Sequence, residues 1–290
     1  MNKLALGTAQ FGSKYGVANQ SGQIKFSDAE KILKLAKNSN IDLIDTAIGY
    51  GNSQKIIGEI GITDFRLVSK LFDLPKNCDD VNSWVEEKVK SSLKHLGVKS
   101  LYGLLVHRSE NLLGNPGKKL IKALNSLKFN GLVKKIGISI YDPLELDQVM
   151  HLTNFDIIQA PLNIVDRRLE TSGWLSRLNK FGVEVHTRST FLQGLLLMKR
   201  NKIPKIFDKW QSILDQWLSE LEKNNLNAIN ECLTYPLSLP EISYIIVGVD
   251  NFHQLKDLIE ISKFQKSNKD WSFMTSNDQM LINPYNWKKL

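Results

Sequence analysis

The stretch LLVHRSENLLGNPGKKLIKALNSLKFNGLVKKIGIS, residues 104–139, holds a complete strand–helix–strand unit. Two short apolar runs of strand character, Leu104–His107 and Ile136–Ser139, flank a helical segment that Asn130-Gly131 ends. The apolar residues of this segment recur at helical spacing: Leu120, Ile121, Leu124 and Leu127. A helix that joins two strands in this way predicts parallel pairing, and therefore an α/β fold.

The same alternation covers the rest of the chain. Further strand-like runs occur at a steady interval: Leu4–Gly7, Leu43–Asp45, Leu67–Lys70, Ile157–Ala160, Val183–Thr187 and Tyr244–Val247. Eight strands joined by helices fit either a doubly wound sheet or a closed (β/α)8 TIM barrel. Because the strands are short and no Gly- or Pro-rich linker divides the chain, we predict a barrel that forms a single domain over residues 1–290.

Two features modify this plain barrel. The first strand starts close to the N-terminus, so we expect no N-terminal hairpin across the bottom of the barrel. Between the seventh and eighth strands, Trp210–Leu221 and Leu226–Leu233 predict two additional helices.

The composition is that of an ordinary soluble protein, with 290 residues of which 42% are hydrophobic and 23% charged. No apolar run approaches the ~20 residues that span a bilayer, and no secretory segment precedes the first strand. Two cysteines, Cys78 and Cys232, fit a reducing compartment, so we expect a cytoplasmic protein. The net charge is +8, but the lysines are scattered, so we expect neither nucleic acid nor a membrane as partner, and a monomer by default.

Reactive side chains stand at the ends of successive predicted strands, which is where barrel proteins carry their sites. Asp45 ends the second strand and Tyr50 follows it, Lys70 ends the third, and His107 ends the fourth. A free phenol has a pKa of about 10, so Tyr50 needs a cation such as Lys70 beside it, with Asp45 to hold that cation. His107 would orient a substrate oxygen. The set predicts proton transfer to or from such an oxygen near neutral pH.

Each of these residues also has an ordinary structural explanation. Asp45 suits a turn, Lys70 a solvated strand end, and His107 a buried imidazole near the core, while Tyr50-Gly51 suits turn packing. Four such residues at consecutive strand ends are better explained by one shared site.

These residues resemble the aldo-keto reductase family, and the resemblance covers nearly the whole chain. Asp45-Thr46-Ala47-x-x-Tyr50-Gly51 is similar to the family's second-strand signature, and Val68-Ser69-Lys70 and Leu105-Val106-His107 stand where the family keeps its Lys and His. The resemblance implies a metal-free NAD(P)-dependent oxidoreductase that interconverts a carbonyl (aldehyde, ketone or sugar) and its alcohol. Asp45, Tyr50, Lys70 and His107 would be its catalytic residues, with Tyr50 as the general acid–base.

The resemblance also implies a nicotinamide dinucleotide lying across the barrel mouth. Ser139 and Gln159 would hold its carboxamide, and Gly7 and Thr8 would lie against the nicotinamide and its ribose. The remaining residues implied in cofactor binding follow the seventh and eighth strands: Arg188, Ser189, Leu192, Gly194, Val249, Gln254 and Asp257.

The chain departs from the family at several of these positions. Arg188 stands where many members have a Tyr that stacks on the nicotinamide; it would raise the reduction potential of the bound cofactor or face a carboxylate or phosphate of the substrate, or turn to solvent or the cofactor pyrophosphate. Gly248 and Gln254 stand where members that bind NADP carry Lys and Arg. The resemblance favours NADP slightly over NAD, because members of the family commonly use NADP. The residues at these two positions instead predict weak selection for the 2′-phosphate. Gln254 also fits a capping box with Asn251.

Phe11 and Tyr15, in the loop after the first strand, would line the substrate pocket or pack within the loop. Two other functions remain open at this stage. One is a non-catalytic nicotinamide-binding regulatory subunit on the same fold. The other is a barrel lyase that uses Lys70 to form a Schiff base, which Asp45 disfavours because it keeps Lys70 charged.

Overall fold

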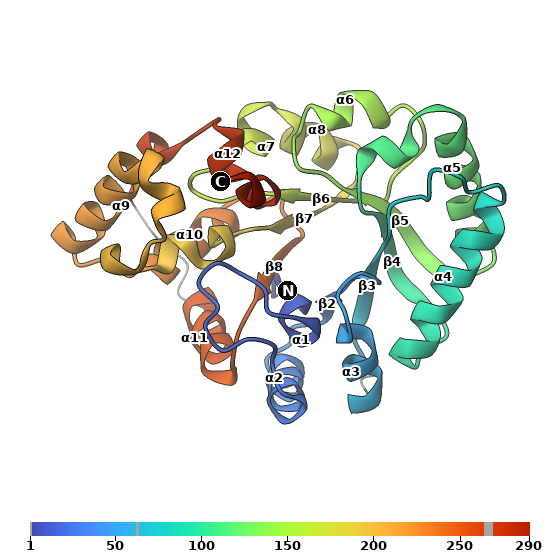
Figure 1. The fold of residues 1–290 in the computed structure, drawn as a ribbon, viewed down its shortest axis with the longest axis horizontal. Coiled ribbons are helices and arrows are strands. Elements are labelled where there is room, and N and C mark those ends of the chain that lie inside the picture. The colour runs from blue at the N-terminus through green and yellow to red at the C-terminus, as the bar shows by residue number, and fades with distance from the viewer. Residues whose placement is uncertain (1, 62–63, 264–268) are drawn as a thin grey trace.

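The computed structural model describes residues 2–61, 64–263 and 269–290, and its eight parallel strands close into a barrel in chain order (Figure 1). The closure joins the first strand to the last, with Leu4 beside Ile245 and Gly7 beside Gly248. The strands are β1 (Leu4–Gly7), β2 (Leu43–Asp45), β3 (Arg66–Leu71), β4 (Leu101–Val106), β5 (Val133–Ser139), β6 (Ile157–Pro161), β7 (Glu184–Arg188) and β8 (Tyr244–Gly248). The predicted (β/α)8 barrel is confirmed.

Helices surround this barrel and line its mouth. The α-helices are α1 (Ala9–Gly12), α2 (Phe26–Asn38), α3 (Ser53–Ile60), α4 (Val81–Leu96), α5 (Gly114–Phe129), α6 (Glu145–Val149), α7 (Arg168–Thr171), α8 (Trp174–Lys180), α9 (Gln211–Lys223), α10 (Ala228–Ser238), α11 (Phe252–Lys263) and α12 (Gln279–Ile282). Short 3-10 turns are η1 (Ser109–Leu112), η2 (Leu192–Leu197), η3 (Arg200–Lys202), η4 (Lys205–Trp210), η5 (Ser272–Met274) and η6 (Pro284–Lys289). The two helices expected between the seventh and eighth strands are α9 and α10, and Figure 1 shows α9 at the opposite end of the long axis from α4 and α5. No helix in the described ranges is long and apolar enough to cross a membrane.

Three apolar clusters hold this arrangement together. The barrel interior contains Ala5, Leu43, Val68, Leu105, Ile157, Tyr244 and Ile246. A larger shell lies between the strands and the surrounding helices, as alternating burial on both faces of a parallel sheet requires. A third cluster, rich in aromatic residues such as Trp217, Trp271 and Trp287, joins α9 and α10 to the C-terminal segment.

The N-terminal end of the barrel is closed by polar side chains. In the described part of the chain, Asn2 and Lys3 precede β1. Glu184 accepts hydrogen bonds from the Tyr102 hydroxyl at 2.7 Å and from Lys135 at 2.6 Å. Arg66 donates to the Tyr244 hydroxyl at 2.9 Å and stacks on the Tyr102 ring.

Candidate active site

At the opposite, C-terminal end of the strands, Lys70 and Asp45 form a buried ion pair. Lys70 is 1% exposed, and its Nζ lies 2.5 Å from Oδ1 of Asp45 and 3.1 Å from the carbonyl oxygen of Thr46. The same ammonium lies 5.1 Å from the centre of the Tyr50 ring. The structure thus brings Asp45, Lys70 and Tyr50 together, while His107 follows β4 directly.

Two glycines hold the backbone that carries Tyr50. A side chain at Gly12 would bring its Cβ within 1.6 Å of the Tyr50 carbonyl oxygen, and one at Gly51 would come within 2.4 Å of the Gly12 carbonyl oxygen. Gly51 also has a φ of +51°, which favours glycine. The loops after β1 and β2 therefore touch backbone to backbone, and this contact fixes where Tyr50 stands.

Two charged side chains act in opposite directions on Tyr50. Burial and the negative charge of Asp45 raise the pKa of Tyr50, and the positive charge of Arg188 opposes this rise. Lys70 is paired with Asp45, and burial lowers the pKa of Lys70 against the opposing effect of Asp45. Arg188 therefore adds a second positive charge near Tyr50, which the sequence did not predict.

His107 is neutral at physiological pH. Its pKa is lowered to about 4, first by burial and then by the positive charges of Lys70 and Arg188. A neutral imidazole can donate a hydrogen bond to a substrate oxygen without delivering its own proton in an acid–base step.

Buried polar groups continue from Asp45 around the barrel. Gln159, with no exposed surface, donates from Nε2 to Oδ2 of Asp45 at 2.7 Å, and Ser139 donates to Oε1 of Gln159 at 3.4 Å. On the other side, the Thr8 hydroxyl donates to the backbone oxygen of Asp45 at 3.0 Å. Gly7, the last residue of β1, precedes Thr8. The residues expected to hold a carboxamide thus also brace the Asp45–Lys70 pair.

The loop after β7 is strained. Ser189, Leu192 and Gln193 have φ values of +65°, +48° and +53°, a region that costs non-glycine residues energy, and Gly194 follows at +89°. Its Thr190 hydroxyl is buried and has no hydrogen-bond partner in the described chain. The Leu192 side chain is fully buried in the aromatic cluster, so this residue offers only its backbone to the mouth.

At the start of α11, Gln254 caps its own helix. Its Oε1 accepts from the backbone N–H of Asp250 at 2.7 Å, and its own N–H donates to the Asn251 side chain at 3.0 Å. The Val249 side chain is buried in the core, and Asp257 is exposed further along the helix. Asp250 accepts a hydrogen bond from Asn19 at 2.8 Å, so a carboxylate occupies the end of β8.

Arg188, the last residue of β7, reaches across the mouth. Its Nη2 donates to the carbonyl oxygen of Ile140 at 3.0 Å and its Nη1 to the Ser189 hydroxyl at 3.3 Å. The guanidinium stacks on the Tyr141 ring, 4.5 Å from its centre. These contacts hold the cation against the loop that follows β5.

The two residues expected to line the substrate pocket have different surroundings. Tyr15 is 44% exposed, and burial of its hydroxyl and the nearby Tyr50 raise its pKa, which places it at the mouth. Phe11 has no exposed surface and packs in the shell between strands and helices, so its side chain does not line the mouth.

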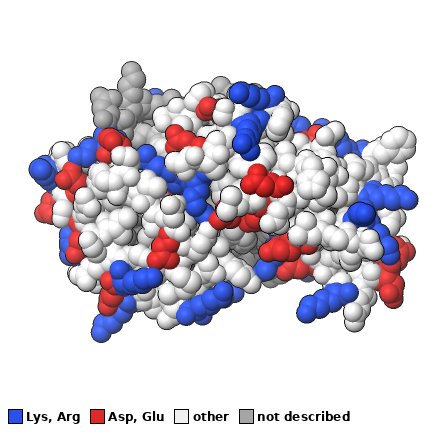
Figure 2. Space-filling model, turned by 90° about the horizontal axis from the view of Figure 1, so that it is seen from above, with Lys and Arg blue, Asp and Glu red and all other residues white. Residues whose placement is uncertain are grey.

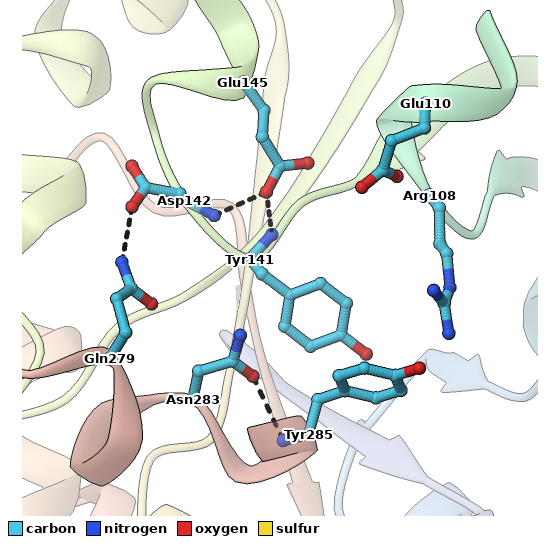
Figure 3. Close-up of a pocket in the computed structure, with 8 residues that line it drawn as sticks. All are labelled: Arg108, Glu110, Tyr141, Asp142, Glu145, Gln279, Asn283 and Tyr285. Carbon is cyan, nitrogen blue, oxygen red and sulfur yellow. Dashed lines mark hydrogen bonds between the residues drawn. The ribbon is translucent and has the colours of Figure 1, made fainter.

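A polar pocket with a volume of about 250 Å³ lies beside this mouth and was not predicted from the sequence (Figure 3). Tyr141 forms one wall, with the Tyr285 ring 6.0 Å away and Arg108 stacked on Tyr285 at 4.7 Å. The lining residues come from the loops after β4 and β5 and from the C-terminal segment: Arg108, Glu110, Tyr141, Asp142, Glu145, Gln279, Asn283 and Tyr285. Only their positions in the sequence could have indicated two of these pocket residues: Arg108 directly follows His107, and Tyr141 comes shortly after the end of the fifth strand.

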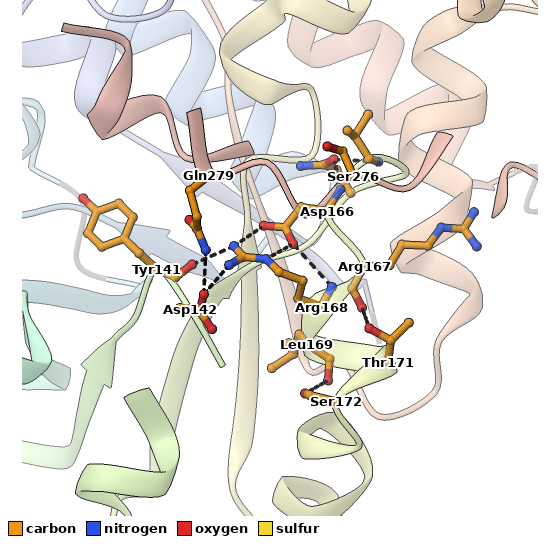
Figure 4. Close-up of polar contacts among 12 residues, drawn as sticks. Tyr141, Asp142, Asp166, Arg167, Arg168, Leu169, Thr171, Ser172, Ser276 and Gln279 are labelled. Atoms are coloured by element: carbon orange, nitrogen blue, oxygen red, sulfur yellow. Dashed lines mark hydrogen bonds and ion pairs between the residues drawn. The ribbon is translucent and has the colours of Figure 1, made fainter. Parts of the chain in front are cut away.

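A buried arginine ties these segments together (Figure 4). Arg168 forms two hydrogen bonds with the buried Asp166, at 2.8 and 2.9 Å, and a third with Asp142 at 2.5 Å. It also donates to the carbonyl oxygen of Tyr141 at 2.9 Å, while Gln279 donates to Asp142 at 2.6 Å. This cluster fixes Tyr141 and the C-terminal segment over the mouth, and its members come from three segments that are far apart in the sequence.

In the part of the chain that the structure describes, no group of three or more His, Cys, Asp or Glu residues could hold a metal ion. Basic and acidic side chains are interspersed on the face that Figure 2 shows. The site is therefore a mouth lined by a phenol, an ammonium–carboxylate pair, a neutral imidazole and a guanidinium, at the C-terminal end of a (β/α)8 barrel.

Comparison with known proteins defines the family. The model of the Aldo/keto reductase family matches residues 3–278, and the chain belongs to this family. The NADH-specific methylglyoxal reductase of Escherichia coli is 26% identical over 276 residues, covering 82% of this chain and 84% of that protein. The uncharacterized oxidoreductase YqkF of Bacillus subtilis is 25% identical, covering 92% of each. The aldo-keto reductase AKR11C1 of Bacillus halodurans, in its holo form, shares the fold, with a TM-score of 0.74, 19% identity, and coverage of 98% of this chain and 95% of that one.

Membership makes the chain an oxidoreductase of a family that uses a nicotinamide cofactor and acts on small molecules.

Proposed function

We propose that the protein is a cytoplasmic NAD(P)-dependent reductase that interconverts a carbonyl and its alcohol at the mouth of the barrel. The observation that carries this proposal is the buried Lys70–Asp45 pair beneath the Tyr50 ring. Tyr50 would give its proton to the carbonyl oxygen during reduction, or take it back during oxidation. His107, neutral at physiological pH, would donate a hydrogen bond that orients this oxygen.

The residues at the mouth fit a nicotinamide dinucleotide. Ser139 and Gln159 carry a hydroxyl and an amide at neighbouring strand ends, the chemistry that a carboxamide needs; both are buried and hydrogen-bonded to each other, so holding a carboxamide requires them to change partners. The strained loop after β7, with the unpartnered Thr190 hydroxyl, supports a ligand-binding role, because strain of this kind clusters at functional sites. The cofactor supplies the hydride; the chain supplies placement and the proton.

For the choice of dinucleotide, we propose that the protein binds both NADPH and NADH. A slight preference for NADP is expected only because members of the family commonly use it. Gln254 is committed to capping α11, and Asp250 places a negative charge at the end of β8. Both features weaken selection for the 2′-phosphate of NADP. The NADH specificity of the Escherichia coli relative is consistent with weak phosphate selection here.

The test is a reduction assay with NADPH and NADH against methylglyoxal, 4-nitrobenzaldehyde and a set of aldoses. Wild type is expected to reduce at least one of them, Tyr50→Phe to bind cofactor without turnover, and Tyr235→Phe, a tyrosine bonded to Glu170 outside the mouth, to match wild type. Cofactor binding without any turnover by wild type would favour the regulatory subunit. Borohydride trapping of a carbonyl on Lys70 in a protein that binds neither nucleotide would favour the Schiff-base lyase.

A further inference from the structure

Arg188 is a cation at the mouth with no carboxylate partner in the described part of the chain. Three other cations around the mouth are paired. Lys70 binds Asp45, Arg108 lies 3.3 Å from Asp73, and Arg168 binds Asp166 and Asp142. Arg188 is half-buried, and a partly desolvated guanidinium without a carboxylate is stabilised when an anion binds it.

The surroundings hold this guanidinium in a fixed orientation. In the described part of the chain, two of its five N–H groups donate hydrogen bonds, to the Ile140 carbonyl and the Ser189 hydroxyl, and its face lies on the Tyr141 ring. Because these contacts fix the planar group, little side-chain entropy remains to be lost when a ligand binds. The remaining N–H groups form a fork suited to a carboxylate or phosphate.

The position of Arg188 relates it to the reacting groups. Its positive charge lowers the pKa of both Tyr50 and His107, so the guanidinium lies close to the two groups that would contact a substrate carbonyl. Tyr141, on which it stacks, also forms a wall of the polar pocket of about 250 Å³. A substrate bound between Tyr50 and this pocket would pass the guanidinium.

We propose that the substrate carries an oxyanion, a carboxylate or phosphate, close to its carbonyl, and that Arg188 binds this oxyanion. The proposal rests on the reductase function proposed above and names its substrate class. Three acids near the mouth are engaged elsewhere: Asp45 and Asp142 are paired with Lys70 and Arg168, and Glu145 accepts from the backbone of Tyr141 and Asp142. Glu110 is exposed on the wall of the polar pocket, and no ion pair joins it to Arg188 in the described residues.

The test uses pairs of unreactive probes that differ in charge. Binding of oxamate and its neutral isostere oxamide is measured by calorimetry on protein saturated with NADH or NADPH, and glycerol 3-phosphate is compared with glycerol in the same way. We expect one of the two anions to bind wild type roughly tenfold or more tightly than its neutral partner, as charge-assisted hydrogen bonds allow. The oxamate and phosphate arms distinguish a carboxylate from a phosphate.

The variants locate the effect. Arg188→Gln is expected to abolish the preference and Arg188→Lys to keep part of it. Arg167→Gln is the matched control, because Arg167 also stacks on a tyrosine, Tyr235 at 4.6 Å, and Figure 4 shows it pointing away from Tyr141 and Asp142. The thermal unfolding of each variant is measured beside its binding.

Three results would overturn the proposal. Wild type that binds neither anion better than its neutral partner excludes an oxyanion site, whether or not the variants fold. A preference that survives in Arg188→Gln assigns it to another group, and a loss confined to NADH or NADPH binding assigns Arg188 to the cofactor. Failure of the proposed reductase function gives a different result, because neither nucleotide then binds. In that case the binding of the anionic and neutral probes is measured on the protein without nucleotide.

Discussion

The two ends of the barrel carry similar side chains with different pairing. At the N-terminal end, Lys135 lies 2.6 Å from Glu184 and Arg66 lies 3.4 Å from Asp42, and Tyr102 donates to Glu184. At the C-terminal end, Tyr50 and Arg188 have no carboxylate bonded to them in the described chain. Satisfied groups contribute to stability, whereas groups left without partners are available to a ligand. For Tyr50 and Arg188, the absence of a bonded carboxylate in the described residues therefore separates them from Tyr102 and Arg66, which are residues of the same type at the other end.

The largest expected effect separates the two ends with one pair of variants. Tyr50→Phe is expected to lower kcat by about 10²–10⁴-fold, the usual contribution of a general acid, with little change in unfolding. Tyr102→Phe, which loses the bond to Glu184, is expected to lose about 1 kcal/mol of stability and to keep kcat. Steady-state kinetics and urea unfolding on both variants measure this. Equal losses of kcat would show that the ends are not separate.

Glu184→Gln is expected to destabilise the barrel without changing kcat. The change removes the charge that Lys135 and Tyr102 contact, and because the pair is partly solvated the cost is expected to be about 1–3 kcal/mol. Urea unfolding at neutral pH measures it, with the exposed Glu222→Gln as control. If the unfolding free energy of Glu184→Gln equals that of the control within error, Glu184 does not stabilise the N-terminal end.

The same carboxylate predicts a pH dependence of stability. Burial tends to raise the pKa of Glu184, but hydrogen bonds from His186, Lys135 and Tyr102 outweigh it and lower the pKa to about 2. A depressed pKa contributes stability that is complete above the unfolded value of about 4.3 and is lost as the pH falls through 2. The difference in unfolding free energy between wild type and Glu184→Gln should be constant above pH ~5 and smaller at pH ~3. A constant difference down to pH ~3 would contradict this.

His107 gives a pH prediction for the mouth. Because its pKa is about 4, it should stay neutral across the physiological range, with no imidazole protonation near the ordinary value of about 6.5. An NMR titration of the ring protons, assigned with His107→Gln, measures it. Protonation near the ordinary value would mean that burial and the charges of Lys70 and Arg188 do not act on His107 as the structure indicates.

The smallest expected effect concerns dinucleotide choice. Asp250→Asn removes the carboxylate at the end of β8 and should shift the ratio of dissociation constants for NADPH and NADH toward NADPH by roughly two- to five-fold, as for a partly exposed charge. Asp257→Asn, on the exposed face of α11, provides the comparison. An unchanged ratio in Asp250→Asn would place the 2′-phosphate away from Asp250.

The sequence was sufficient for the barrel because strand and helix periodicity are local properties, as the 104–139 unit illustrates. The sequence was also sufficient to predict that Asp45, Lys70 and Tyr50 lie close together, because the C-terminal strand ends of a barrel share one mouth. It could not show that Arg188 also acts on Tyr50 as a cation, because that depends on where the closed barrel places the guanidinium.

Side-chain direction and distant partners were also beyond the sequence. Phe11 is aromatic, as residues that line substrate pockets often are, but its side chain is buried in the core. The packing of the loop after β1 decides this direction. Arg168, Asp142 and Gln279 come from three separate segments, and only the closed barrel brings them together.

The proposed function requires that the mouth binds a nicotinamide dinucleotide and that Tyr50 serves proton transfer rather than binding. A fluorescence titration with NADPH and NADH on wild type and Tyr50→Phe, followed in the same samples by addition of methylglyoxal and 4-nitrobenzaldehyde, measures both properties. We expect similar dissociation constants for the two proteins and oxidation of the bound cofactor only in wild type. Binding of neither nucleotide, or equal turnover by both proteins, would contradict it.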